Sequence, residues 1–103
     1  MNIKNGLIVA TTSPSTGEVN LTGSAAQLPD VPCQYGVIKA NASNTGVVYL
    51  GGSGVTVADG TTDTTSGFPL AAGEQMIAPV SNLNILYGIA ATTGDDISYI
   101  CFN

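Results

Sequence analysis

Short stretches in which apolar and polar residues alternate recur along the chain, and no stretch sustains an apolar pattern at helical spacing. The clearest is 33–40, where Tyr35 and Val37 fall on one face and Ile38 falls on the other. The stretch 97–102 near the end of the chain follows the same rule. Successive side chains of a strand point to opposite faces, so this alternation predicts strands that bury one face.

Turn-forming residues separate these stretches at intervals of about 8–12 residues, which is typical of sandwiches and barrels. Candidate strands lie at 6–12, 18–22, 33–40, 46–51, 55–57, 68–70, 74–79, 83–92 and 97–102. The fold expected from this pattern is all-β, an antiparallel β-sandwich or a jelly-roll-like barrel of six to eight strands.

The length of 103 residues suits one domain with one core. Residues 1–32, interrupted by Pro29 and Pro32, carry little apolar pattern of their own. We expect this part to form an extended N-terminal arm or edge strands. Residues 33–103 are then expected to form the sandwich core.

Charged residues make up 9% of the chain, against about 25% in a typical soluble domain. The net charge is −5, and Lys4 and Lys39 are the only cations. Nucleic-acid binding needs cations that replace phosphate counterions, so neither a nucleic acid nor an anionic membrane surface is an expected partner. The large neutral surface favours a homo-oligomer or a partner-bound protein, because contacts in an assembly bury such surface.

The catalytic options are few. The chain has no His, which removes Ser/His and Cys/His nucleophile pairs. A Cys–Lys or Asp–Asp arrangement remains formally possible, but Asp95 and Asp96 are adjacent in a predicted turn, where successive side chains diverge. We therefore expect a protein that is not an enzyme, and we assign no catalytic or cofactor-binding residue.

No metal site is expected either. Zinc takes four Cys or His ligands, and the chain has two Cys. The run 51–56 superficially resembles a calcium-binding nonapeptide repeat, but Thr56 stands where that repeat needs Asp. Asp59 and Asp63 could hold a weak cation, but a solvated loop is the favoured interpretation.

The apolar run 7–10 is too short for a signal-peptide core or a membrane span, so we expect synthesis and retention in the cytoplasm. Cys33 and Cys101 are 101 − 33 = 68 residues apart. In a reducing compartment two cysteines are more often free, buried thiols than a bridge. We favour free thiols here, with a disulfide as the alternative.

Several segments carry a resemblance to a known class of protein. They are Ile38-Lys39-Ala40-Asn41, Asn44-Thr45-Gly46, 48–56, 66–74 and 83–90. Together they resemble a small β-sandwich module of virion structural proteins of tailed bacteriophages, including head-decoration (cement) proteins. The resemblance covers roughly residues 33 to 102 and consists of turns and core positions.

The resemblance implies a capsid decoration protein that binds the outer surface of the head and stabilises the shell. Its partner would be the major capsid protein, its oligomer a trimer, and its location the virion, after synthesis in the host cytoplasm. Related modules occur in tails and fibres, so a receptor- or glycan-binding module is the alternative.

The N-terminal segment is the expected contact region. It could add a strand to the open sheet edge of a neighbouring subunit. The residues predicted to contact the capsid or another subunit are Ile3, Leu7, Ile8, Val9 and Leu21.

Overall fold

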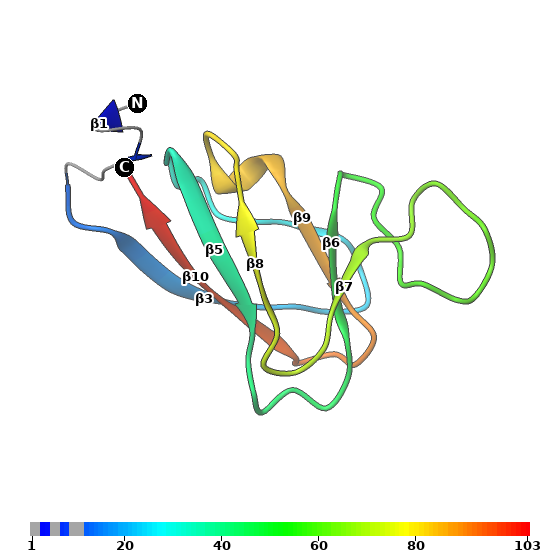
Figure 1. The fold of residues 1–103 in the computed structure, drawn as a ribbon. Helices are drawn as coiled ribbons and strands as arrows, with labels where there is room; N and C mark the ends of the chain where they lie inside the picture. The colour runs from blue at the N-terminus through cyan, green and yellow to red at the C-terminus, as the bar shows by residue number, and fades with distance from the viewer. Residues whose placement is uncertain (1–2, 5–6, 9–11) are drawn as a thin grey trace.

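The computed structural model describes residues 3–4, 7–8 and 12–103, and it contains two four-stranded antiparallel sheets that pack face to face (Figure 1). The first sheet has the order β3 (Ser15–Asn20), β10 (Asp96–Phe102), β5 (Tyr35–Ala40), β8 (Gln75–Ala78). The second has the order β4 (Ala26–Gln27), β9 (Tyr87–Ala90), β6 (Val48–Gly51), β7 (Phe68–Leu70).

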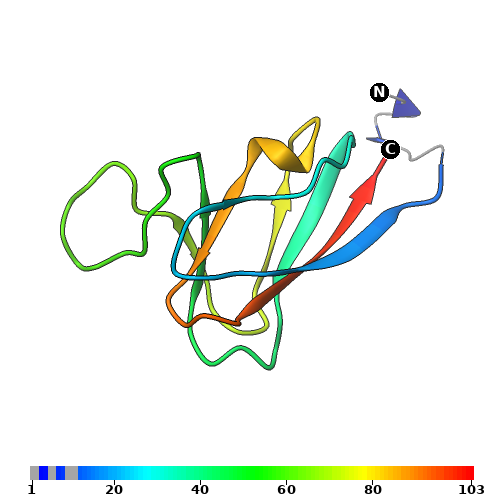
Figure 2. The same cartoon turned by 180° about the vertical axis from the view of Figure 1, so that it is seen from behind.

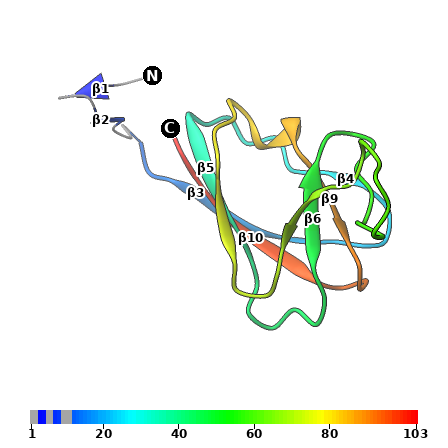
Figure 3. The ribbon, with the colours of Figure 1, turned by 45° about the vertical axis from the view of Figure 1, so that its right-hand side comes forward.

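Two smaller elements complete the described chain. The strands β1 (Ile3–Lys4) and β2 (Leu7–Ile8) pair with each other and lie beyond the end of the first sheet, near the C-terminus (Figure 3). A short 3-10 helix, η1 (Leu83–Ile85), lies in the connection between β8 and β9.

The strand order is that of a jelly roll. Counted from β3 as the first strand to β10 as the eighth, the two sheets have the orders 1-8-3-6 and 2-7-4-5. Every connection from β3 onward, except that between β6 and β7, crosses from one sheet to the other, as the view from behind shows (Figure 2). The predicted all-β antiparallel sandwich is therefore confirmed.

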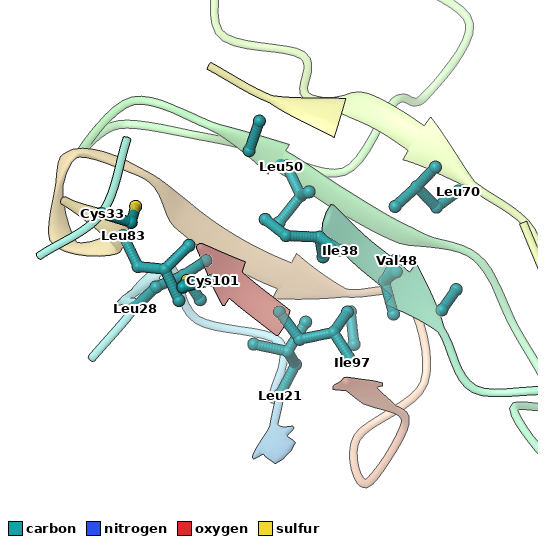
Figure 4. Close-up of a cluster of buried hydrophobic side chains, with 13 residues drawn as sticks. Leu21, Leu28, Cys33, Ile38, Val48, Leu50, Leu70, Leu83, Ile97 and Cys101 are labelled. Atoms are coloured by element: carbon teal, nitrogen blue, oxygen red, sulfur yellow. The ribbon is translucent and has the colours of Figure 1, made fainter. Parts of the chain in front are cut away.

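One apolar core fills the space between the sheets (Figure 4). Ile38 and Ile97 come from the first sheet and Val48 from the second, and all three are fully buried. Burial of an aliphatic side chain of this size stabilises the fold by about 1.5–3 kcal/mol. The alternation in 33–40 and 97–102 reflects this core, because the inward residues of β5 and β10 alternate with outward ones.

The predicted strands 55–57 and 83–92 differ from the observed structure. Residues 55–57 form no strand, and Thr56 makes only an isolated bridge to Ser66. The stretch 83–92 begins as the helix η1, since the Asn82 side chain accepts a hydrogen bond from the Asn84 amide and caps that turn. The strand itself is limited to β9.

The expectation that residues 1–32 hold little of the core is wrong for the part from β3 onward. All six residues of β3 pair with β10, and Leu21 and Leu28 are buried in the core. The candidate strand 18–22 is observed as Ser15–Asn20, which begins and ends earlier in the chain. As expected, β3 and β4 lie at sheet edges.

The segment 52–67 lies on the side of the second sheet that faces away from the first (Figure 1). Its Val55 packs against Tyr49 of β6 and Ile89 of β9 and forms a small second cluster. The second sheet is therefore covered by apolar residues on both faces. The outer face of the first sheet carries Ile77, the most exposed large apolar side chain of the described residues.

Candidate interaction surface

The outer face of the first sheet presents two parallel rows of side chains. Residues directly opposite one another in antiparallel strands share a face. The register places Val37 opposite Ile77 on one side and Ile100 on the other. Thr16 on β3 stands opposite Ile100 and completes this row, which we call the apolar row.

Ile77 is the most exposed member of the apolar row, at 66% of its surface. It owes this to its place on β8, which is the edge strand of the sheet and has a neighbour on one side only. Val37 and Ile100 are half-buried because strands flank them on both sides. The row therefore offers a contiguous apolar surface that crosses the sheet.

An aromatic pair continues this surface toward the end of the sheet. Tyr35 and Phe102 stand opposite each other in β5 and β10, and their ring centroids are 5.0 Å apart with an interplanar angle of 25°. This offset stacking contributes about 0.5–1.5 kcal/mol beyond the area that it buries. It also holds both rings in place on the outer face.

The second row is polar and carries both signs of charge. Lys39 stands opposite Gln75 and Ser98, and Ser98 stands opposite Glu18 on the far side. We call these four residues the polar row. Lys39 is the only cation in residues 12–103, and the backbones of Lys39 and Glu18 lie two strand spacings apart, roughly 10 Å. The Ser98 hydroxyl between them donates to Asn41 Oδ1 at 2.6 Å.

A small hollow lies at the second sheet, between the two ends of the segment 52–67. Its volume is about 190 Å³. The lining residues are Gly51, Gly52, Gly54, Val55, Thr64, Thr65 and Ser66. This volume is below the range of about 300–1,000 Å³ that is usual for pockets of drug-sized ligands.

Two aspartates shape the loop around this hollow. Asp59 Oδ1 accepts from the Thr61 amide at 2.9 Å, and Asp63 Oδ1 accepts from the amides of Thr65 and Ser66 at 2.7 and 2.8 Å. The Thr61 hydroxyl also donates to Asp59 Oδ1, at 2.6 Å. The Thr61 hydroxyl and then its amide lower the pKa of Asp59, the Thr65 amide is the largest cause of the lowered pKa of Asp63, and both carboxyl groups are fully exposed. The favoured interpretation of an exposed loop agrees with this geometry.

The Asp95–Asp96 turn holds the loop that precedes β6. Asp95 is buried, and its carboxylate accepts from the amides of Thr45 at 3.0 Å and Gly46 at 2.8 Å. The Asn44 side chain pairs with the backbone of Asp96, donating to its carbonyl oxygen and accepting from its amide, each at 2.8 Å. These contacts fasten the loop before β6 to the start of β10.

Cys33 and Cys101 are free thiols, and both are buried at one end of the core near Leu83 (Figure 4). Cys33 Sγ donates to the Val80 carbonyl oxygen at 3.2 Å. Burial, together with the neighbouring Cys33, raises the pKa of the Cys101 thiol to about 12. The favoured prediction of free, buried thiols is confirmed.

The five residues predicted to contact the capsid or another subunit lie in different parts of the structure. The prediction for Leu21 is wrong, because its side chain is 0% exposed and packs in the core. Ile3, Leu7 and Ile8 belong to β1 and β2, of which the structure describes the backbone pairing only. Val9 lies outside the described residues.

Sequence reasoning missed the apolar row. Its signal was present in 33–40, which is apolar on both faces, and in Ile77 within the predicted strand 74–79.

Within the described ranges, no group of three or more potential metal ligands comes together, and no helix is long and apolar enough to cross a membrane. A comparison with protein-family models, curated proteins and solved structures finds no significant match to this chain.

Proposed function

We propose that this protein is a bacteriophage capsid decoration protein, which binds the outer surface of the head and stabilises the shell. The observation that carries the proposal is the apolar row of Val37, Ile77 and Ile100 on an open sheet face. Contiguous exposed apolar surface marks interaction sites. Jelly rolls serve as viral coat and lectin domains, so the fold fits this role without selecting it.

The composition supports a role in assembly rather than in chemistry. The chain has no His, and the buried Asp95 carboxylate is engaged by two backbone amides. We therefore include in the proposal that the protein is not an enzyme. Many copies with individually weak contacts would hold the shell together, because multivalent attachment multiplies modest affinities.

A decoration protein needs contacts to the shell and, in an oligomer, contacts between copies. We assign the shell contact to the start of the predicted N-terminal arm, residues 1–11, with the major capsid protein as partner. The apolar row then remains for contacts between copies. The segment 1–11 has one cation, Lys4, and no acidic residue, whereas residues 12–103 carry all seven acidic residues.

The test is an add-back experiment on expanded heads that lack the protein. Full-length protein should co-sediment with the heads and raise the temperature at which they release their genome. A variant without residues 1–11 should bind more weakly. Heads that neither bind the full-length protein nor gain heat resistance would contradict the proposal.

The hollow at Gly51–Gly54 and Thr64–Ser66 favours one second candidate, a receptor- or glycan-binding module of a tail or fibre. Its hydroxyl groups and exposed glycine backbone suit a neutral, polyhydroxylated ligand, and its volume of about 190 Å³ limits that ligand to roughly one sugar ring. Binding on a glycan array that is lost in Gly54→Val would favour this candidate over the first.

A further inference from the structure

The two rows on the first sheet have a self-complementary arrangement. The polar row has its cation, Lys39, on β5 and its anion, Glu18, on β3. These two strands flank β10 on opposite sides. A two-fold rotation about an axis along β10 exchanges the positions of the two flanking strands, so it exchanges the positions of the two charges.

We propose that two copies of this chain pair face to face through the outer faces of their first sheets, about a two-fold axis along β10. Packed sheets lie about 10 Å apart with their strands within about 30° of each other. In this arrangement each row of one copy covers the same row of the other. Lys39 of each copy then faces Glu18 of the other, which forms two equivalent ion pairs.

Three residues of the apolar row, Ile100, Val37 and Thr16, complete the interface together with Phe102. Ile100 faces Ile100 of the other copy at the axis, and Phe102 faces Phe102. Val37 faces the methyl group of Thr16 of the other copy, because β5 of one copy covers β3 of the other. The contact is isologous, so each contact between two different residues occurs twice. Ile77 and Gln75 lie on β8, which extends beyond the edge strand β3 of the other copy, so they remain outside the contact.

Charge explains why a second copy fits this face despite the net charge of −5. The pairing brings Lys39, the only cation of residues 12–103, against Glu18 of the other copy. It also separates the two Lys39 side chains, which are offset from each other by about two strand spacings, roughly 10 Å. The exposed residues Phe68 and Ile85 come from β7 and η1 and take no part.

This inference concerns the purified protein and does not depend on the proposed function. The resemblance to cement proteins implies a trimer, whereas the face-to-face contact predicts a dimer. Sedimentation equilibrium over a range of concentrations distinguishes these states. A mass of twice the chain that dissociates on dilution supports the proposal, and a monomer throughout or a trimer overturns it.

Two matched variants locate the contact. Ile100→Asp places a charge at the axis and should abolish the dimer, whereas Ile85→Asp adds the same charge at a site that is 53% exposed and away from the interface. Circular dichroism and thermal unfolding check that both variants fold. A dimer that survives Ile100→Asp, or that Ile85→Asp disrupts equally, overturns the proposed surface.

A charge exchange tests the pairing with two exposed side chains, whose replacement leaves the core intact. Lys39→Glu alone and Glu18→Lys alone each set like charges against each other and should raise the dissociation constant roughly tenfold. The double variant restores opposite charges and should return the dissociation constant close to the wild-type value. Additive weakening in the double variant overturns the two-fold geometry.

Discussion

The aromatic ring of Tyr99 occupies the space beside Gly17 on the neighbouring strand. The two residues are directly opposite in β10 and β3, and a Cβ atom at position 17 would lie 2.5 Å from the Tyr99 hydroxyl oxygen and 2.7 Å from its ring. Glycine is therefore required here by close approach rather than by a special backbone angle. The edge strand β3 can lie against β10 because position 17 has no side chain.

Gly17→Ala should destabilise the protein by about 1–3 kcal/mol, because the new methyl group displaces the Tyr99 ring. Urea unfolding followed by circular dichroism measures this change. Asn20→Ala, on the exposed side of the same strand and outside the two rows, serves as the control and should change stability by less than about 0.5 kcal/mol. Equal effects of the two substitutions would show that the ring does not fill this space.

Leu21→Ala should lower the free energy of unfolding by about 2–5 kcal/mol, since the side chain is fully buried between the sheets. The neighbouring Thr22 is exposed, so Thr22→Ala is the matched control. Thermal or urea unfolding provides the measurement. A stable Leu21→Ala variant would return this residue to the surface role that the sequence predicted.

Asp95→Ala should cost about 1–3 kcal/mol, because the amides of Thr45 and Gly46 lose their acceptor. Asp95→Asn keeps one carbonyl oxygen and should cost less. Hydrogen exchange of the Thr45 and Gly46 amides should accelerate in the alanine variant, while Ser43→Ala in the same loop leaves it unchanged. Unaltered exchange in Asp95→Ala would contradict the proposed anchoring of this loop.

The buried thiols should resist alkylation in the folded protein at pH 8 and react once it is unfolded. The pKa of Cys101 is raised from its ordinary 9.0 to about 12, so the unfolded chain ionises first as the pH rises. The contribution of this raised pKa to the free energy of unfolding is fully present below pH 9, and it is lost as the pH rises from 9 to about 12.

Cys101→Ala provides the comparison for this pH dependence, because Tyr and Lys titrate in the same range. The wild type should lose more stability than the variant over the same pH interval. Rapid labelling of either thiol at pH 8 under native conditions would contradict the burial that the structure describes.

The Asp63 carboxyl should titrate below its ordinary pKa of 3.8, because the amides of Thr65 and Ser66 donate to the ionised form. These hydrogen bonds stabilise the folded protein at pH values above the ordinary pKa, and this contribution is lost as the pH falls through the lowered pKa. NMR titration of the Asp63 carboxyl carbon measures this pKa. Thr65→Val removes the hydroxyl donor and should move the pKa upward, and a wild-type value at or above 3.8 would refute the prediction.

The sequence predicted most of the sandwich, because β5 and β10 alternate strictly between a buried and an outward face. It misplaced β3, for which it predicted 18–22 where the strand is Ser15–Asn20, because Gly17 gives no strand signal. The pairing of β3 with β10 depends on residues about 80 positions apart and on the space that Gly17 leaves for Tyr99. Local pattern carries no information on such a contact.

The interaction surface could be predicted only in part for a related reason. Val37, Ile77 and Ile100 are each ordinary strand residues in the sequence. They become a row only through the register of β8, β5 and β10, which pairs segments distant in the chain. Leu21 was predicted to be a contact residue because residues 1–32 were expected to form an arm with little core of its own, whereas its side chain is fully buried between the sheets.

The proposed function places this protein on a virus particle, and electron cryomicroscopy of that particle tests the proposal most directly. The account predicts density for this two-sheet jelly roll on the outer surface of the head, in contact with the major capsid protein. Density for the same fold on the tail or a fibre, or a particle that lacks the protein altogether, would contradict it.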